Sequence, residues 1–226
     1  MAFADELVNI KAIFTSLIEA LELSDPYTRG HSERVGSLSV ALGLELGLTT
    51  RELEVLKDAG ALHDIGKIGV SKELLNKPGR LTELEFDEVK RHAIYGYNIL
   101  KPLDQPELLD ITLLHHERID GKGYPYGRSD LPILVRVAQI ADVWDALTSD
   151  RPYRSAMTFA KARELMGGNE NTFGFDPMLL ETFLRLTRFI FPEGDCDPDE
   201  MSRILDEIAG LNLSEDLSTA SATVSA

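Results

Sequence analysis

The chain has 226 residues, of which 43% are hydrophobic and 27% charged, and its formal net charge is -15. This composition is typical of one soluble globular domain with appendages, and the negative charge argues against binding of long nucleic acid, because the molecule would repel phosphates. No apolar run is long enough to span a bilayer, and the N-terminus has acidic residues where a secretory signal would be basic. We therefore expect a cytoplasmic protein that does not insert into membranes.

The first predicted element is a helix within residues 1–24. Its apolar residues alternate steps of four and three, which is the spacing of a coiled-coil seam: Phe3, Leu7, Ile10, Phe14, Leu17 and Leu21. Two interpretations remain open for so short a seam. Residues 3–21 form a homodimer or transmit a signal, or the helix packs on its own domain.

Further helices follow, each with a recognisable start signal, and no segment has the alternating pattern of a strand. The start signals are Asp25 with Pro26, Thr49 with Glu52, Thr82 with Glu85, Pro106, Pro132, and Asp176 with Pro177. We expect Gly66 to stop the second of these helices and the third to run through His92 toward Ile99. The fold class is therefore all-α.

Residues 191–226 form an acidic C-terminal extension. One amphipathic stretch lies at about residues 201–211, and the chain ends in small polar residues. Such residues bury too little surface to order themselves, so we expect the end to be disordered.

All five histidines lie between residues 31 and 116, and two adjacent pairs, His63 with Asp64 and His115 with His116, carry most of the signal. Neighbouring helix residues diverge by about 100°, so an adjacent pair converges only at a helix end or on more than one ion. A carboxylate can bridge two metals, whereas an imidazole nitrogen normally serves one. Five imidazoles with Asp64 and a later Asp142 are too many for one tetrahedral zinc and suit two ions with open positions.

Five sequence features together resemble the HD-GYP subclass of the HD metal-dependent phosphohydrolases, over about residues 25–190. They are HSERV at His31, ALHDIGKIGV around His63, the isolated His92, HHERIDGKGYP from His115, and IADVWDALTSDRPYR ending at Arg154. The HDxGK part is common to many HD enzymes, but HHExxDGxGYP is specific to the subclass. The resemblance implies an HD-domain helical bundle and a cyclic di-GMP phosphodiesterase that yields pGpG, and in some members GMP, by means of a hydroxide that bridges two metals.

The resemblance also implies a role for each matching residue. One metal would be held by His31, His63, Asp64 and Asp142, and the other by the bridging Asp64 with His92, His115 and His116. Asp64 and Lys67 would be catalytic, and the substrate phosphates would be bound by Lys67, Arg151 and Arg154. Mixed histidine and carboxylate ligation suits two divalent ions, foremost iron or manganese, with nickel, cobalt or zinc as alternatives. Some members hold a third metal through a glutamate four residues before the first histidine; here that residue is Tyr27, so we expect two.

Two further residues have a functional and an ordinary interpretation. Tyr124 could stack on a base of the substrate or contact a partner domain, within a segment where Gly121 and Pro125 serve a tight turn. Asp145, one helical turn beyond Asp142, could orient a ligand or a bound water, or could be an exposed helix carboxylate. Trp144 and Tyr153 are more typical of core packing than of a base-stacking platform.

Two alternatives to cyclic di-GMP hydrolysis remain. One is a catalytically weak receptor or protein-interaction module, for which a missing ligand or a missing Lys67 would have been the signal. The other is a phosphodiesterase for a different cyclic dinucleotide, which a substrate panel would separate. A diguanylate cyclase or a sensory domain is an expected partner in either case.

Overall fold

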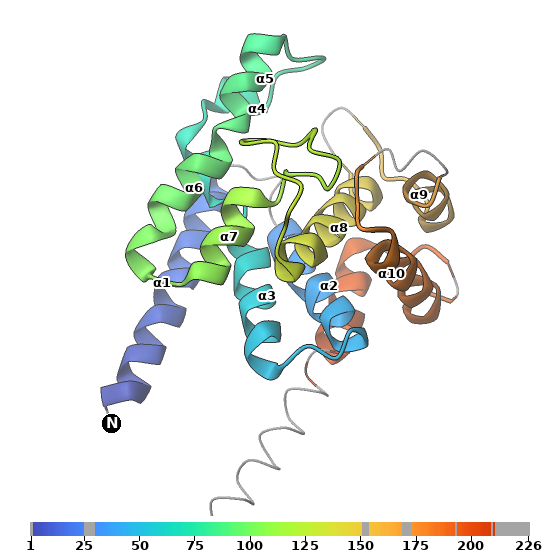
Figure 1. Ribbon diagram of the computed structural model, residues 1–226, viewed down its shortest axis with the longest axis horizontal. Helices are drawn as coiled ribbons and strands as arrows, with labels where there is room; N and C mark the ends of the chain where they lie inside the picture. The colour runs from blue at the N-terminus through green and yellow to red at the C-terminus, as the bar shows by residue number, and fades with distance from the viewer. Residues whose placement is uncertain are drawn as a thin grey trace, which may run out of the picture.

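The computed structural model describes residues 2–24, 30–150, 154–168, 173–192, 194–208 and 210, and within them it is helical without any strand (Figure 1). This confirms the all-α prediction. The elements in chain order are α1 Ala2–Ser24, α2 His31–Glu45, α3 Thr50–Leu62, the 3-10 helix η2 Ile65–Gly69, α4 Lys72–Leu75, α5 Glu83–Lys90, α6 His92–Leu100, the 3-10 helix η3 Lys101–Leu103, α7 Pro106–Leu114, α8 Ile133–Thr148, α9 Phe159–Met166 and α10 Pro177–Ile190. Residues 198–208 form one further helix.

The predicted helix starts are confirmed where the structure describes them. Thr49 and Thr82 each form a complete capping box with the glutamate three residues later. Asp176 accepts hydrogen bonds from the first free amides of α10, and proline occupies the first turn. Residues 25–26 lie outside the described residues, but the helix that carries His31 begins at that residue, after Gly30, and not at Pro26 as predicted.

Two expectations about helix ends are wrong. The helix that begins after Thr82 ends at Lys90, and α6 begins at His92 after a turn at Arg91. The His92 ring donates a hydrogen bond to the Val89 carbonyl. In an unbroken helix this carbonyl would accept the amide of residue 93 instead. Likewise Gly66 does not stop α3, which ends at Leu62. A Cβ at Gly66 would lie 1.8 Å from the His92 carbonyl oxygen, so its small size allows η2 to pack against α6.

The core lies between α2, α3, α7 and α8, with α2 the most enclosed helix. A Cβ at Gly60 on α3 would lie 2.6 Å from the Gly36 Cα on α2, so the two helices meet backbone to backbone. On the other side of α8, Trp144 is fully buried and packs on Phe159 and Phe183, with ring centroids 5.4 and 5.6 Å away. The core assignment of Trp144 is thus confirmed.

The second half of α1 belongs to this core. Phe14 and Leu21 are buried, and the helix packs against η2 and α3. These two positions therefore face the chain's own domain, as one of the two interpretations requires, and the homodimer through residues 3–21 stays a prediction. None of the described helices combines the length and apolarity needed to cross a membrane.

The C-terminal extension is attached to the domain through residues 198–208. Met201 and Leu205 are buried, and the Ser37 hydroxyl donates to Asp206 at 3.2 Å. The predicted disordered end lies outside the described residues. At the opposite end of the molecule α4 and α5 form an arm, residues 72–90, that projects from the body (Figure 1).

Candidate metal centre

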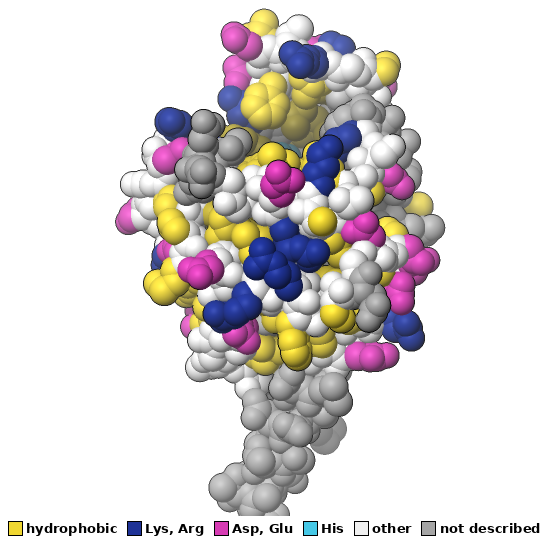
Figure 2. Space-filling view, turned by 90° about the vertical axis from the view of Figure 1, so that its right-hand side faces the viewer, with side chains coloured by type: hydrophobic (Ala, Val, Ile, Leu, Met, Phe, Trp, Pro, Cys, Tyr) yellow, Lys and Arg dark blue, Asp and Glu magenta, His cyan; other side chains and the backbone are white. Residues whose placement is uncertain are grey.

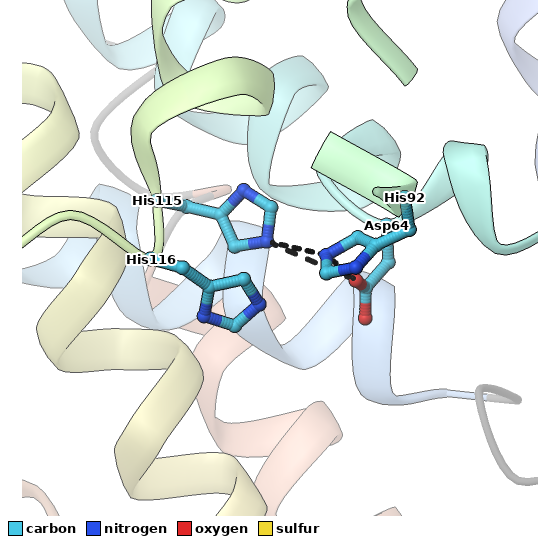
Figure 3. Close-up of side chains that lie close together, drawn as sticks. All are labelled: Asp64, His92, His115 and His116. Atoms are coloured by element: carbon cyan, nitrogen blue, oxygen red, sulfur yellow. Dashed lines mark hydrogen bonds and ion pairs between the residues drawn. The ribbon is translucent and has the colours of Figure 1, made fainter. Parts of the chain in front are cut away.

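Seven histidine and aspartate side chains that are spread over more than a hundred positions in the sequence converge on one place. They form two groups, each with its ligand atoms within 4.8 Å of one another: Asp64, His92, His115 and His116 in one group, and His31, His63 and Asp142 in the other. All except His116 are buried. The structure thus brings together every side chain for which a ligand role was predicted. Figure 3 shows the first of the two groups.

Asp64 lies between the two groups. Its Oδ1 is 3.3 Å from His92 Nε2 and 3.9 Å from His115 Nε2, while its Oδ2 is 3.3 Å from His63 Nε2. Each carboxylate oxygen therefore faces a different group. This is the arrangement that a bridging carboxylate needs.

Three imidazoles are oriented by main-chain carbonyls three residues earlier. The Nδ1 atoms of His63, His92 and His115 lie 2.6, 2.7 and 2.9 Å from the carbonyl oxygens of residues 60, 89 and 112. Because a carbonyl can only accept, each Nδ1 carries the proton. Each Nε2 is then left with a lone pair directed into the cluster, which is the tautomer that binds metals.

His31 is oriented differently, by a side chain. Its Nδ1 lies 2.7 Å from Oδ2 of Asp145, which is completely buried. Arg34 holds the same carboxylate through Nε at 2.6 Å and Nη2 at 3.0 Å. Asp145 is therefore not an exposed carboxylate, and its position fits the orienting role. Sequence reasoning missed Arg34, although its place three residues after His31 puts both on one helix face.

The cluster contains polar atoms that a cation would satisfy. His63 Nε2 and Asp64 Oδ1 are buried and have no hydrogen-bond partner, and His31 Nε2 lies 3.4 Å from Asp142 Oδ1. In addition, His92 Nε2 and His115 Nε2 are 3.2 Å apart with no proton to share. Two nitrogens bound at about 2.0–2.1 Å to one ion lie roughly 3.0–3.4 Å apart, and buried polar atoms left unpaired cost about 1–3 kcal/mol each. The donor set therefore fits divalent transition-metal ions.

The protonation states of His92, His115 and His116 support the same conclusion. Burial, reinforced by the neighbouring imidazoles, lowers the pKa of His92 and His115 and brings that of His116 to about 3. These rings are neutral at neutral pH. Burial also opposes the charge on His31, but the hydrogen bonds and charges of Asp142 and Asp145 raise its pKa to about 9.

The two carboxyl groups remain charged. Burial would raise the pKa of Asp64, but the charge of Lys67 holds it well below the usual value. For Asp142, the hydrogen bond from His31 likewise outweighs burial and lowers the pKa. Both aspartates are therefore available as anionic ligands.

The predicted substrate residues are placed only in part. Lys67 Nζ lies 2.6 Å from Asp64 Oδ2 at the edge of the cluster, with 19% of its side chain exposed. The Tyr124 ring stacks on His116, with centroids 4.6 Å apart. Arg154 donates to the carbonyl of Ala146 on α8. Residues 27, 151 and 153 lie outside the described residues.

The loop that carries Tyr124 is held by two buried residues that sequence reasoning missed. The Glu117 carboxylate accepts the amides of Tyr126 at 2.6 Å and Arg128 at 2.8 Å. The Gln139 amide donates to the main-chain carbonyls of Leu114 and Glu117, on either side of the histidine pair. The only signal for Glu117 was its place directly after His116, and Gln139 had none beyond lying on a buried helix face.

Comparison with known proteins gives consistent results. The sequence model of the HD domain family matches residues 15–179. A cyclic di-GMP phosphodiesterase of Pseudomonas aeruginosa is 42% identical over 77% of this chain and 42% of its own length. A cyclic di-GMP phosphodiesterase of Thermotoga maritima is 39% identical over 83% of this chain and 51% of its own length. A 3'3'-cGAMP-specific phosphodiesterase of Vibrio cholerae is 36% identical over 86% of this chain and 41% of its own length. The chain spans about half the length of these curated relatives or less.

Solved structures of similar fold include a cyclic GMP-AMP-specific phosphodiesterase of V. cholerae, with a TM-score of 0.54, 32% identity, and 82% of this chain and 42% of that chain covered. The HD domain of the L. monocytogenes phosphodiesterase PgpH, in complex with cyclic-di-AMP, has a TM-score of 0.52 at 23% identity and covers 87% of this chain and 95% of that one. At that identity the likeness concerns the fold alone.

Proposed function

The chain belongs to the HD-domain family, in its HD-GYP subclass, and from this premise we propose that it is a phosphodiesterase with a binuclear metal centre that hydrolyses cyclic di-GMP to pGpG, with GMP as the alternative end product. The observation that carries the proposal is the cluster itself. Seven buried or half-buried ligand side chains turn their Nε2 and carboxylate atoms toward common centres, and several of these atoms have no protein partner.

Two divalent ions would be held by the two groups, with Asp64 shared between them. We propose iron or manganese, with nickel, cobalt or zinc as alternatives. When bound, such a pair supplies Lewis-acid chemistry for in-line hydrolysis of a phosphodiester.

The chain's own residues position the substrate. Lys67 is ion-paired with Asp64 and partly exposed, so its ammonium group is within reach of a phosphate that approaches the cluster. There it would stabilise the negative charge that develops on the phosphoryl oxygens. Asp64 stays ionised and serves as a ligand rather than as an acid. Arg151 and Arg154 are proposed to bind the phosphates on the grounds of the motif alone.

A second substrate is favoured by a specific observation. A V. cholerae relative at 36% identity is named for 3'3'-cGAMP, and a V. cholerae structure at 32% identity is named for cyclic GMP-AMP. This hybrid dinucleotide is therefore the alternative substrate. A catalytically weak receptor remains the alternative from another class, although the ligand set is complete. The cytoplasmic location, the homodimer, and a diguanylate cyclase or sensory partner domain stay predictions from the sequence.

The test combines elemental analysis of the purified protein with chromatography of the products formed from cyclic di-GMP and 3'3'-cGAMP. We expect two transition-metal ions per chain and conversion of at least one dinucleotide to its linear form. Asp64→Asn should lower turnover by roughly 10³-fold or more and reduce bound metal, because it weakens the shared ligand and removes several kcal/mol of charge stabilisation.

Asp130→Asn is the matched control, since the Asp130 side chain is 89% exposed and lies outside the cluster. This variant should keep normal turnover and metal content. Full metal content with no cleavage of either dinucleotide would favour the receptor. Normal turnover in Asp64→Asn would contradict the assignment of the centre.

A further inference from the structure

An aromatic pair, of which one ring is exposed, lies beside the metal cluster. Phe86, on α5 of the arm, is 46% exposed and meets Tyr124 of the loop edge to face, with ring centroids 6.1 Å apart. The two residues come from segments that are distant in sequence. Figure 2 shows hydrophobic side chains on the arm where it faces the hollow between the arm and the rest of the molecule.

The pair continues the ring system of the cluster outward. Tyr124 is stacked on His116 at an interplanar angle of 30° and lies 6.5 Å from the His92 ring. Its amide donates to the His116 carbonyl at 3.1 Å, which fixes the ring relative to the predicted ligands. A series of aromatic rings therefore extends from the cluster through Tyr124 to Phe86, and the phenyl ring of Phe86 is the exposed end of that series.

A cation is held over both rings. Lys90 Nζ lies 5.2 Å from the Phe86 centroid and 5.9 Å from the Tyr124 centroid, and it is ion-paired with Asp87 at 2.6 Å. This contact ties the two rings together. It also places a positive charge next to the cluster in a chain whose net charge is -15.

We propose that Phe86 and Tyr124, with Lys90 over them, form a stacking platform for one nucleobase of the cyclic dinucleotide, an inference that rests on the proposed function. The phosphate at the cluster and the base are joined through a ribose, so the base lies close enough to the cluster to reach rings that adjoin it. Stacking uses the π-face that every base has and involves no hydrogen-bond readout. The platform therefore contributes affinity for the dinucleotide and does not distinguish guanine from adenine.

Steady-state kinetics of the metal-loaded enzyme test the platform. Phe86→Ala should raise KM by about tenfold or more with little change in kcat and in metal content, because it removes one stacking surface. Phe86→Tyr should restore KM. Leu84→Ala is the matched control, since Leu84 is 82% exposed on the same arm. The KM of this variant should not change. An unchanged KM in Phe86→Ala would overturn the proposal.

A fluorescence experiment gives a readout that does not need hydrolysis. The single native tryptophan, Trp144, is completely buried, so Phe86→Trp adds an exposed reporter at the platform. Titration with GMP or AMP should quench the new signal, whereas ribose 5-phosphate, which has no base, should not. Leu84→Trp should respond to none of the three probes.

The two experiments separate the platform from the proposed function. Base-dependent quenching at residue 86 in a protein that cleaves no cyclic dinucleotide would support the platform and refute the phosphodiesterase. Cleavage with equal quenching at residues 84 and 86, or with none at residue 86, would support the phosphodiesterase and refute the platform.

Discussion

The three imidazoles that follow the end of a helix and His31, which does not, are held in different ways. His63 and His115 follow the last residues of α3 and α7, and His92 follows the end of α5. The last carbonyls of a helix have no intrahelical partner, so each ring can donate Nδ1–H to a carbonyl three residues back. His31 instead begins α2, where the backbone offers free N–H groups and no such carbonyl. It depends on a carboxylate from α8.

The difference shows what each position requires of the rest of the chain. A histidine at a helix end is oriented by the backbone that precedes it, and the negative ends of the α3 and α7 dipoles also favour a cation there. His31 requires Asp145, and Asp145 is in turn held by Arg34, 111 residues earlier in the sequence. The first arrangement should therefore be sensitive to helix placement and the second to single side chains.

The largest expected effect comes from moving a helix. In Gly66→Ala the new methyl group would lie 1.8 Å from the His92 carbonyl oxygen and 2.4 Å from the Gly96 amide, so α6 must shift away from η2. We expect a loss of roughly 3 kcal/mol or more in the free energy of unfolding, measured in urea. The protein that remains folded should have lost metal, because His92 moves with α6.

Gly168→Ala serves as the control for this variant. The atoms nearest to a methyl group added at Gly168 would be two carbonyl oxygens at 3.6 Å, an ordinary van der Waals distance. Stability and metal content should change little. If Gly66→Ala kept both stability and metal content, placement of α6 would not determine how His92 is oriented.

A smaller effect is expected from the side-chain arrangement. Asp145→Asn keeps one acceptor oxygen but removes the charge that pairs with His31 and Arg34. Metal affinity or activity should fall by about 10–100-fold, the usual cost of losing a partner that orients a ligand. Titration of the metal-free protein with metal should show one weakened site and one unchanged site, because the other group does not include His31.

Two equally weakened sites would mean that Asp145 supports the whole cluster rather than His31. In Asp145→Asn the buried Arg34 also loses its anionic partner, so the variant could lose stability as well as metal affinity. Thermal unfolding of the metal-free variant measures that loss of stability separately.

How far the sequence predicts these features depends on whether their cause is local. Capping boxes at Thr49 and Thr82 follow from residues three apart, and the clustered histidines and aspartates were identified because their motifs are contiguous in the sequence. The turn at Arg91 was missed because the His92 ring, and not a proline or glycine, breaks the helix. Arg34 and Gln139 were missed because their partners are distant in sequence.

The smallest expected effect concerns the other end of α3. Here the helix start is held by the Thr49 hydroxyl, which accepts the Glu52 amide, while Glu52 accepts the Thr49 amide at 2.8 Å. Thr49→Ala should cost about 1 kcal/mol in the free energy of unfolding, and Thr49→Ser should recover most of it. Because His63 is oriented by the last turn of the helix and not by its first, metal content and kcat should remain unchanged in both variants. Loss of metal in Thr49→Ala would show that the two ends of α3 are coupled, and that the end of a helix does not orient its histidine independently.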